Sequence, residues 1–454
     1  MTTVTLVYPY FRPSHDNSIF RFPPLGLGYL TSSLRKRGFS AELVDCTFLT
    51  DEEAMKRVRQ SRPKIIGIQS MFSMKRKALE FTRTFRDDCE LLVAGGPQPT
   101  ANPSEFLDHF DVAVVGEGEE TIVDLAEHFE GGADLSEVKG IAYHAGSERG
   151  ISFTPSRGFV QTLDDIPFPA RESFDNKAYM DYYSKNYGYT TTSVMTSRGC
   201  PFQCDFCSRA VFGNDFRTRS PSNIVDEMQD VATLGYDRVW FADDCFTLNR
   251  NRLITICNEI IRRRLDIGWE CLSRVDTVDN EIAQIMKRAG CVRMFFGIES
   301  GNNRILSLMK KQITTQQAEK AVKAAKRAGI QAGAFFIVGY PGEDHGTVLD
   351  TVRFASSLPL DYLSFTMPYP IPGTPLYERV KATMIDDEWE EPKNLNLVKH
   401  RLMFQSSFSE GMLKLVIVKG MAQFYARKYL GSRGYRLVGE PFEAMSDKVI
   451  EHLR

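Results

Sequence analysis

The chain has 454 residues, and 43% hydrophobic with 25% charged side chains is ordinary for a soluble globular protein of about three domains. The 56 basic and 58 acidic residues leave a net charge of −2, so charge gives no argument for a nucleic-acid partner. No stretch reaches the 18 apolar residues of a membrane span and the N-terminus lacks a secretory pattern, so we expect a cytoplasmic protein.

Short β-branched runs alternate with helical patterns over the first 130 residues. Five runs predict strands at 3–8, 41–45, 63–70, 90–96 and 111–116, with helices at 23–38 and 120–129. Strands alternating with helices imply right-handed parallel crossovers. We therefore expect a doubly wound α/β sheet over residues 1–135, with a crevice at the carboxyl ends of its strands.

A linker with a candidate hairpin is predicted at 136–189 from its Gly and Pro residues, and the alternation then restarts. Six candidate strands lie at 191–197, 237–243, 267–274, 292–299, 331–340 and 361–369, with helices around 221–234, 250–264, 279–289, 314–328 and 346–357. Six βα units predict a partial (βα)6 TIM-like barrel at 190–385, with its chemistry at the C-terminal strand ends. A small helical C-terminal region is expected at 386–454.

Three of the nine cysteines, Cys200, Cys204 and Cys207, lie within eight residues after the first strand of the second series. In a reducing cytosol this pattern indicates metal or catalysis before disulfides. Structural zinc usually takes two separated ligand pairs, and no second pair stands nearby. Three cysteines on a 4Fe-4S cluster leave one iron open for a substrate or cofactor. Zinc and an iron-sulfur cluster are therefore the candidates for this loop, whereas Cys257 suits core packing.

The C-x3-C-x2-C spacing, with Phe206 before the last cysteine, resembles the motif of the radical S-adenosylmethionine (SAM) enzymes. The resemblance implies that the open iron binds the methionine part of SAM, and that an external one-electron reductant such as flavodoxin or ferredoxin drives cleavage to a 5'-deoxyadenosyl radical. It also implies SAM contacts on the loop and at successive strand ends, by Phe206, Asp243, Asp244, Ser273, Arg274, Glu299 and Gly339.

Each of these residue types suits a different part of SAM. A carboxylate at Asp243 or Asp244 suits the ammonium group. The fork of Arg274 suits the carboxylate, and the absence of a side chain at Gly339 suits a close approach of the adenine. Each residue alone could instead be a helix cap or a turn residue.

Glycine-bearing segments follow the strands of the first domain, where backbone N–H groups can meet a polar or anionic ligand. The combination resembles the cobalamin-binding domain that precedes many radical SAM enzymes, a flavodoxin- or Rossmann-like fold, and the resemblance extends through the linker segment at 163–174. It implies a cobalamin site formed by Pro9, Leu25, Gly26, Ser70, Met71, Phe72, Gly95, Gly96, Pro97, Gly116, Glu117 and Gly118. Met71 and Phe72 could equally be core residues.

The sequence lacks the D-x-H-x-x-G motif that supplies a lower-axial histidine in many cobalamin proteins. We therefore expect cobalamin with its own base displaced and no histidine on cobalt. The loop at 69–72 is expected to face the lower side of the ring.

Residues 399–439 contain eight Lys or Arg and one acidic residue. This balance is typical of helices with a wet basic face. An anionic or amphiphilic substrate lying over the segment is the other interpretation.

Together the two resemblances imply a cobalamin-dependent radical SAM enzyme with a 4Fe-4S cluster, SAM and cobalamin as cofactors. The expected activity is methyl transfer from SAM, via methylcobalamin, to an unactivated carbon of a small-molecule or lipid-like substrate, with a role in biosynthesis. Ring closure, rearrangement or sulfur insertion with the same cofactors stays open, as does a non-catalytic corrin-binding sensor. A methylthiotransferase is disfavoured, because Cys46 and Cys89 are too few to hold a second cluster.

Overall fold

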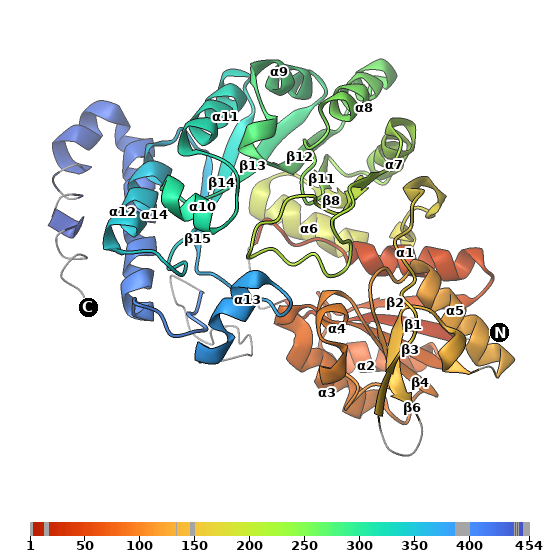
Figure 1. The fold of residues 1–454 in the computed structure, drawn as a ribbon. Helices are drawn as coiled ribbons and strands as arrows, with labels where there is room; N and C mark the ends of the chain where they lie inside the picture. The colour runs from red at the N-terminus through yellow and green to blue at the C-terminus, as the bar shows by residue number, and fades with distance from the viewer. Residues whose placement is uncertain are drawn as a thin grey trace. The chain divides into compact units, whose positions relative to one another are not determined.

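A computed structural model describes residues 3–12, 18–132, 134–145, 150–385, 400–439, 441, 443 and 445–447 of the chain. The chain divides into two compact units, and Figure 1 labels the elements of each. The first unit is Met1–Cys200 with Arg209–Trp240, and the second is Pro201–Ser208 with Phe241–Arg454. Parts of the predicted C-terminal region, at 386–399 and 448–454, lie outside the described residues.

A seven-stranded sheet in the order β2-β1-β3-β4-β5-β6-β7 organises the first unit. Its strands are β1 (Thr3–Tyr8), β2 (Ser40–Asp45), β3 (Ile65–Gln69), β4 (Leu91–Gly95), β5 (Val112–Val114), β6 (Ile141–Ala145) and β7 (Gly150–Phe153). The first five pair in parallel, and the hairpin β6–β7 continues the sheet antiparallel at one edge. The predicted parallel α/β sheet is confirmed.

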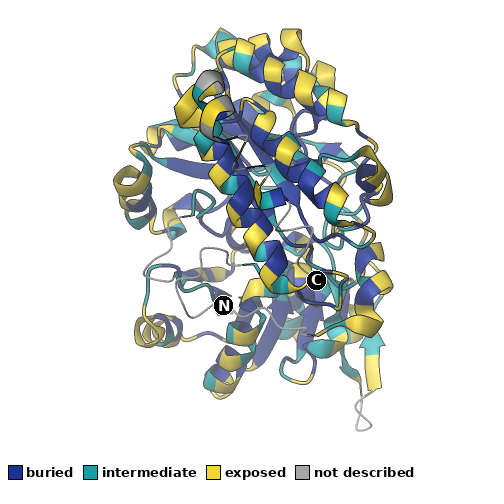
Figure 2. Ribbon diagram, turned by 90° about the vertical axis from the view of Figure 1, so that its left-hand side faces the viewer, coloured by how far each residue is buried: buried dark blue, intermediate teal, exposed yellow. Residues whose placement is uncertain are grey.

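Two hydrophobic cores cover the two faces of this sheet. One contains side chains of α1 (Leu25–Lys36) and α5 (Glu119–Gly131), and the other contains side chains of α2 (Asp51–Gln60) and α3 (Lys75–Phe85). A short helix, α4 (Pro97–Ala101), follows β4. Burial of the strands between half-exposed helices, visible in Figure 2, is what a doubly wound sheet requires.

The linker contains a helix that the sequence analysis did not predict, α6 (Asn176–Tyr187). Its buried face consists of tyrosines: Tyr179, Tyr182 and Tyr183. The Tyr179 hydroxyl donates to Asp45 at 2.7 Å, and the other two donate to backbone carbonyls at 2.7 and 2.9 Å. The apolar periodicity of a helix was absent because tyrosine, not aliphatic side chains, forms the buried stripe.

The predicted barrel strands form one six-stranded sheet in the order β15-β14-β13-β12-β11-β8. They are β8 (Thr191–Val194), β11 (Arg238–Phe241), β12 (Gly268–Ser273), β13 (Cys291–Glu299), β14 (Gln331–Ile337) and β15 (Tyr362–Thr366). Pairing from β12 to β15 is parallel. The predicted partial barrel is therefore confirmed.

Helices follow the strands of this sheet as expected for βα units. They are α7 (Pro221–Thr233), α8 (Arg250–Arg263), α9 (Asn280–Arg288), α10 (Asn303–Leu308), α11 (Thr315–Arg327), α12 (His345–Ser357) and α13 (Pro375–Val380). A two-stranded ladder of β9 (Ser197–Arg198) and β10 (Arg217–Thr218) brackets the segment that carries the cysteines.

The basic C-terminal stretch forms α14 (Glu410–Gly434), which packs against α12 and β15. Several of its charged side chains have partners within the protein. Lys414 pairs with Glu410 at 2.7 Å, and Lys428 donates to the Asp361 carbonyl at 3.1 Å. These contacts favour the interpretation as a solvated helix over a substrate surface.

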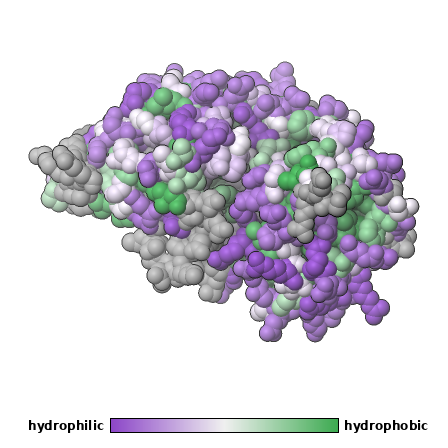
Figure 3. All heavy atoms as spheres, turned by 60° about the horizontal axis from the view of Figure 1, so that its bottom comes forward, coloured by the Kyte–Doolittle hydropathy of each residue, from purple (hydrophilic) through white to green (hydrophobic). Residues whose placement is uncertain are grey.

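In the part of the chain that the structure describes, no helix is long and apolar enough to cross a bilayer. On the face shown in Figure 3, hydrophilic side chains predominate and apolar ones occur in separate patches.

A buried charge triad ties the linker to the start of the barrel within the first unit. Glu227, on α7, is completely buried between Arg171 and Arg219. Nη2 of Arg171 lies 2.5 Å from its Oε1, and Nη1 of Arg219 pairs with its Oε2. Two guanidinium groups are thus held away from water by one carboxylate.

We predict that Glu227→Ala destabilises the protein by about 3–5 kcal/mol, because it leaves two buried cations uncompensated. The shift of the urea midpoint, followed by circular dichroism, measures this loss. Glu319→Ala, which breaks a half-exposed pair with Lys323 on α11, is the control and should change stability by less than about 1 kcal/mol. Equal midpoints for the two variants would contradict a role for the triad.

Candidate active site

Two of the three motif cysteines lie in the segment Pro201–Ser208, here called the cysteine loop, in the second unit. Cys204 is buried and Cys207 is exposed, and the Cys207 N–H donates to the Cys204 carbonyl at 3.3 Å. A hydrogen bond from the Cys207 thiol, aided by the charges of Lys311 and Arg274, lowers the pKa of Cys204 to about 6, and the same hydrogen bond raises the pKa of Cys207. Cys204 is therefore the member of the pair that is more readily a thiolate, the form that binds metal.

Asp205 anchors the cysteine loop, although the sequence analysis did not single it out. Its side chain is fully buried and accepts hydrogen bonds from the Tyr340 hydroxyl and the Arg379 guanidinium. Its backbone also bonds on both sides, from its N–H to the Met309 carbonyl at 3.2 Å and from the Leu376 N–H to its carbonyl at 2.9 Å. The residue between Cys204 and Phe206 is thus fixed by three separate segments.

Cys200 ends the first unit, where its neighbours fix the backbone. Gly199 has φ +84°, and a Cβ there would lie 2.2 Å from the Asp215 carbonyl oxygen, so only glycine fits. Arg198 is buried and pairs with Glu117 at 3.2 Å and with Glu119. In the described residues, no three Cys, His, Asp or Glu side chains are already gathered at metal-binding distance, so the cluster assignment comes from the donor chemistry and the spacing.

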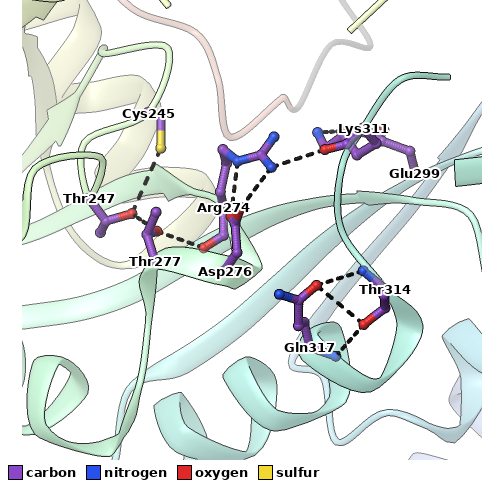
Figure 4. A network of polar contacts seen from close by, with 9 residues as sticks. All are labelled: Cys245, Thr247, Arg274, Asp276, Thr277, Glu299, Lys311, Thr314 and Gln317. Carbon is purple, nitrogen blue, oxygen red and sulfur yellow. Dashed lines mark hydrogen bonds and ion pairs between the residues drawn. The ribbon is translucent and has the colours of Figure 1, made fainter. Parts of the chain in front are cut away.

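Arg274, predicted to meet SAM, follows β12, and its side chain is buried. Its Nε and Nη2 donate to the two oxygens of Asp276, both at 2.9 Å, and Nη2 also donates to the Lys311 carbonyl at 3.0 Å. The guanidinium lies 3.5 Å from the centre of the Phe202 ring in the cysteine loop. In Figure 4, no dashed line joins Nη1 to the residues drawn.

Glu299 ends β13, and its carboxylate accepts a hydrogen bond from the Lys311 ammonium at 2.9 Å (Figure 4). Both side chains are buried. The sequence analysis gave Glu299 a contact with SAM and did not single out Lys311. The structure instead gives Glu299 a partner from its own chain, 12 residues further on.

The remaining predicted SAM residues fall at strand ends with different surroundings. Asp243 is buried and Asp244 is exposed after β11. Ser273 is buried and lies 3.6 Å from the Cys271 sulfur. Gly339 has φ +86°, and a Cβ there would lie 2.5 Å from the Leu413 side chain. This contact explains the glycine without a ligand, so no approach by an adenine is needed to account for it.

A cavity of about 270 Å³ lies in the first unit at the carboxyl ends of its strands. Seven of the predicted cobalamin residues line it: Gly26, Gly95, Gly96, Pro97, Gly116, Glu117 and Gly118. The rest of the wall is mainly apolar, with Leu6, Ile68 and Phe212 among its members. Gln69 also lines the cavity, and its buried side-chain oxygen has no hydrogen-bond partner among the described residues. Such a wall fits a flat apolar group that brings a hydrogen-bond donor.

The carboxylate of Glu117 has partners within the protein. It accepts a hydrogen bond from the Val160 N–H at 2.7 Å and pairs with Arg217 at 2.8 Å, in addition to Arg198. The carboxylate is therefore engaged by the protein's own arginines, and the contact of Glu117 with cobalamin stays a prediction.

The cavity wall does not include five of the predicted cobalamin residues: Pro9, Leu25, Ser70, Met71 and Phe72. The Ser70 carbonyl lies 2.9 Å from where a Cβ of Gly96 would stand, so Ser70 leaves no room for a side chain at that position. Met71 packs against the core beneath α1 and α5, which favours the core interpretation for this residue. The contacts of these five residues with the cobalamin ring stay predictions.

Two family models match the chain, in the order that the sequence analysis predicted. The B12 binding domain matches residues 16–126, and the Radical SAM superfamily matches residues 194–355. The first match contains most of the cavity wall, and the second contains all three motif cysteines.

Curated relatives and a solved structure extend the match. The chain is 34% identical over 416 residues to an uncharacterized methyltransferase of Pyrococcus horikoshii, covering 89% of this chain and 88% of the relative. It is 26% identical to an anaerobic magnesium-protoporphyrin IX monomethyl ester cyclase of Cereibacter sphaeroides, over 96% of this chain and 72% of that one. The cobalamin-dependent SAM radical enzyme OxsB, solved with aqua-cobalamin and SAM bound, has the same fold, with a TM-score of 0.75, 21% identity and 99% and 72% coverage.

We predict that Asp205→Ala lowers the iron content of the anaerobically reconstituted protein several-fold, because the cysteine loop loses its buried anchor. Iron and sulfide analysis, with the visible absorbance, measures the effect. Tyr340→Phe removes one of the two side-chain hydrogen bonds and should give a smaller loss. Full iron content in Asp205→Ala would show that the loop keeps its shape without this anchor.

Proposed function

Because the chain belongs to the cobalamin-dependent radical SAM enzymes, we propose that it transfers a methyl group from SAM to an unactivated carbon of a small-molecule or lipid-like substrate. The observation that carries the proposal is the 34% identity to a protein named as a methyltransferase, which extends over nine-tenths of the chain.

When bound, the cluster supplies the electron that cleaves SAM, and cobalamin supplies the carrier for the methyl group. Cys200, Cys204 and Cys207 are the residues that would hold the cluster. Asp205 fixes the loop between the second and third cysteines, and Arg274 offers Nη1 to the methionine carboxylate. Asp243 and Asp244 place carboxylates at the end of the neighbouring strand β11 for the ammonium group.

The cavity of the first unit suits the base of cobalamin better than the whole ring. A volume of about 270 Å³ is slightly below the range of pockets that enclose a complete drug-sized ligand. Its apolar wall and the unpartnered oxygen of Gln69 fit the displaced dimethylbenzimidazole base and its polar linkage. This placement agrees with the expectation that no histidine takes the base's position on cobalt.

The proposal also assigns partners and a location. An external one-electron reductant of the flavodoxin or ferredoxin class supplies the electron, and the enzyme works in the cytoplasm, where such reductants and free thiols are maintained. The absence of a membrane-crossing helix from the described residues is compatible with this location.

Ring closure with the same cofactors is the second candidate function. The 26% identity to the cyclase of Cereibacter sphaeroides, over 96% of this chain, favours it. The products formed from SAM distinguish methyl transfer from ring closure. Methyl transfer consumes one SAM to donate the methyl group and a second to form the radical, whereas ring closure needs no methyl donor.

We predict that turnover on the true substrate yields 5'-deoxyadenosine and S-adenosylhomocysteine in about equal amounts, because the two SAM molecules have different fates. Mass spectrometry with methyl-labelled SAM should find the label in the product. A variant with all three motif cysteines changed to Ala should form neither labelled product nor 5'-deoxyadenosine. Product without the label, formed together with 5'-deoxyadenosine, would decide for ring closure or rearrangement.

We predict that Gly95→Leu weakens cobalamin binding by about 5- to 140-fold, since overpacking costs about 1–3 kcal/mol and each 1.4 kcal/mol is one decade of affinity. Gly95 lines the cavity and a Cβ there meets no atom within 4 Å, so the side chain enters the cavity without a clash at its root. Titration of the cobalamin absorbance gives the affinity.

Gly150→Leu is the matched control for Gly95→Leu. Gly150 also has open space around its Cβ position, but it lies on the exposed edge strand β7 and outside the cavity. Its affinity should stay within about twofold of the unchanged protein. Equal affinities for both leucine variants would show that the base of cobalamin does not bind in this cavity.

A further inference from the structure

Lys311 is held in place by a local arrangement that begins at Gly297. The pairing of β13 with β14 shifts register between Gly297 and Glu299, and Glu299 has φ +72°, a conformation that side-chain-bearing residues rarely adopt. A Cβ at Gly297 would lie 2.5 Å from Oε1 of Glu299 and 3.0 Å from Nζ of Lys311. The glycine, the bulge and the left-handed turn together make room for the ion pair over the end of the strand.

The ion pair lies against the cysteine loop. Nζ of Lys311 is 5.8 Å from the centre of the Phe206 ring, between Cys204 and Cys207 in sequence. The Lys311 carbonyl accepts from Arg274 at 3.0 Å, and the carbonyl of Met309, two residues earlier, accepts from the Asp205 N–H at 3.2 Å. The segment that carries Lys311 is therefore tied both to the loop and to a strand-end arginine.

Lys311 is a buried cation, and its side chain is only 9% exposed. Its ammonium is held by the Glu299 carboxylate at 2.9 Å, and burial keeps this pair away from water. A positive charge is thus fixed 5.8 Å from the Phe206 ring of the cysteine loop.

We propose that Lys311, fixed by Glu299, is a positioning residue that makes the cluster on the cysteine loop easier to reduce. This inference rests on the proposed function only in assigning a 4Fe-4S cluster to the loop. Net charge and polar contacts near a cluster set its reduction potential. A buried cation stabilises the reduced form, which carries one more negative charge, because charges interact strongly where water is excluded.

The step that Lys311 favours is a one-electron transfer. An external reductant of the flavodoxin or ferredoxin class gives one electron to the cluster and is itself oxidised by one electron. Lys311 keeps its proton throughout and forms no bond. Its contribution is the electrostatic free energy of the added electron, with Glu299 holding the ammonium in one position.

The test is a redox titration of the reconstituted holoenzyme, monitored by electron paramagnetic resonance of the reduced cluster. At a fixed solution potential, Lys311→Met should lower the ratio of reduced to oxidised cluster about tenfold, which is 59 mV for a one-electron couple. Glu299→Gln keeps a hydrogen-bond acceptor but removes the negative charge, so it should raise the ratio. Lys311→Arg keeps the cation, and its ratio should stay within about twofold.

Lys326→Met is the matched control for Lys311→Met. Lys326 pairs with Asp361 at 2.7 Å on α11 and is 35% exposed, and Asp361 lies just before the amino end of β15. This pair therefore stands at the opposite end of the strand from a site at the carboxyl ends. Its removal should leave the ratio unchanged. A drop equal to that of Lys311→Met would mean that any lost lysine has the same effect, and would overturn the proposal.

Iron content is measured first for every variant, so that the ratio refers to intact clusters. If Lys311→Met does not hold a cluster, Glu299→Gln still decides, because only a rise in its ratio supports the proposal. Unchanged ratios at full iron content overturn it, and so does a weaker affinity for SAM in Lys311→Met with an unchanged ratio. Failure of the proposed function shows separately, as an unaltered protein that binds no 4Fe-4S cluster or transfers no methyl group.

Discussion

The pairing of Arg198 with Glu117 and Glu119 is the interaction on which the first unit depends. All three side chains are buried, and both carboxylates belong to residues that line the cavity. Arg198 stands two residues before Cys200, with the constrained Gly199 between them. A break in this pairing leaves a buried charge without a partner, which is far more unfavourable than the loss of an exposed pair. The protein therefore fixes the approach to the first motif cysteine with the same residues that shape the cavity.

Sequence patterns predicted much of this architecture because they are local. The parallel strands, the helices between them and the three closely spaced cysteines can each be recognised from about ten consecutive residues. The helix α6 escaped prediction because its buried stripe is made of tyrosines, which also occur on surfaces. Lys311 escaped because it follows Lys310 in an unremarkable polar segment, and its partner Glu299 stands 12 residues earlier. Pairings of this kind depend on a turn of the backbone that no periodicity records.

The sequence predicted that Glu117 faces the cavity, but it did not predict the ion pairs of the Glu117 carboxylate. The segment that contains it was predicted to face the corrin, and the residue does line the cavity. Its carboxylate nevertheless pairs with Arg198 and Arg217, which lie about 80 and 100 residues further along the chain. A charged residue in a glycine-rich loop was therefore open to two interpretations, and only the position of distant arginines distinguishes them.

Glycine at the end of a parallel strand predicts that something approaches the backbone closely, without specifying what approaches. At Gly95 and Gly116 a Cβ would meet no atom within 4 Å, and both residues line the cavity, so the space is open to a ligand. At Gly297 the space holds the Glu299–Lys311 ion pair, and at Gly339 it holds Leu413. Gly95 and Gly116 thus leave open space in the cavity, whereas Gly297 and Gly339 leave room for the protein's own side chains. One of those side chains places a buried cation 5.8 Å from the Phe206 ring of the cysteine loop, so Gly297 contributes to the charge that a cluster on this loop would meet.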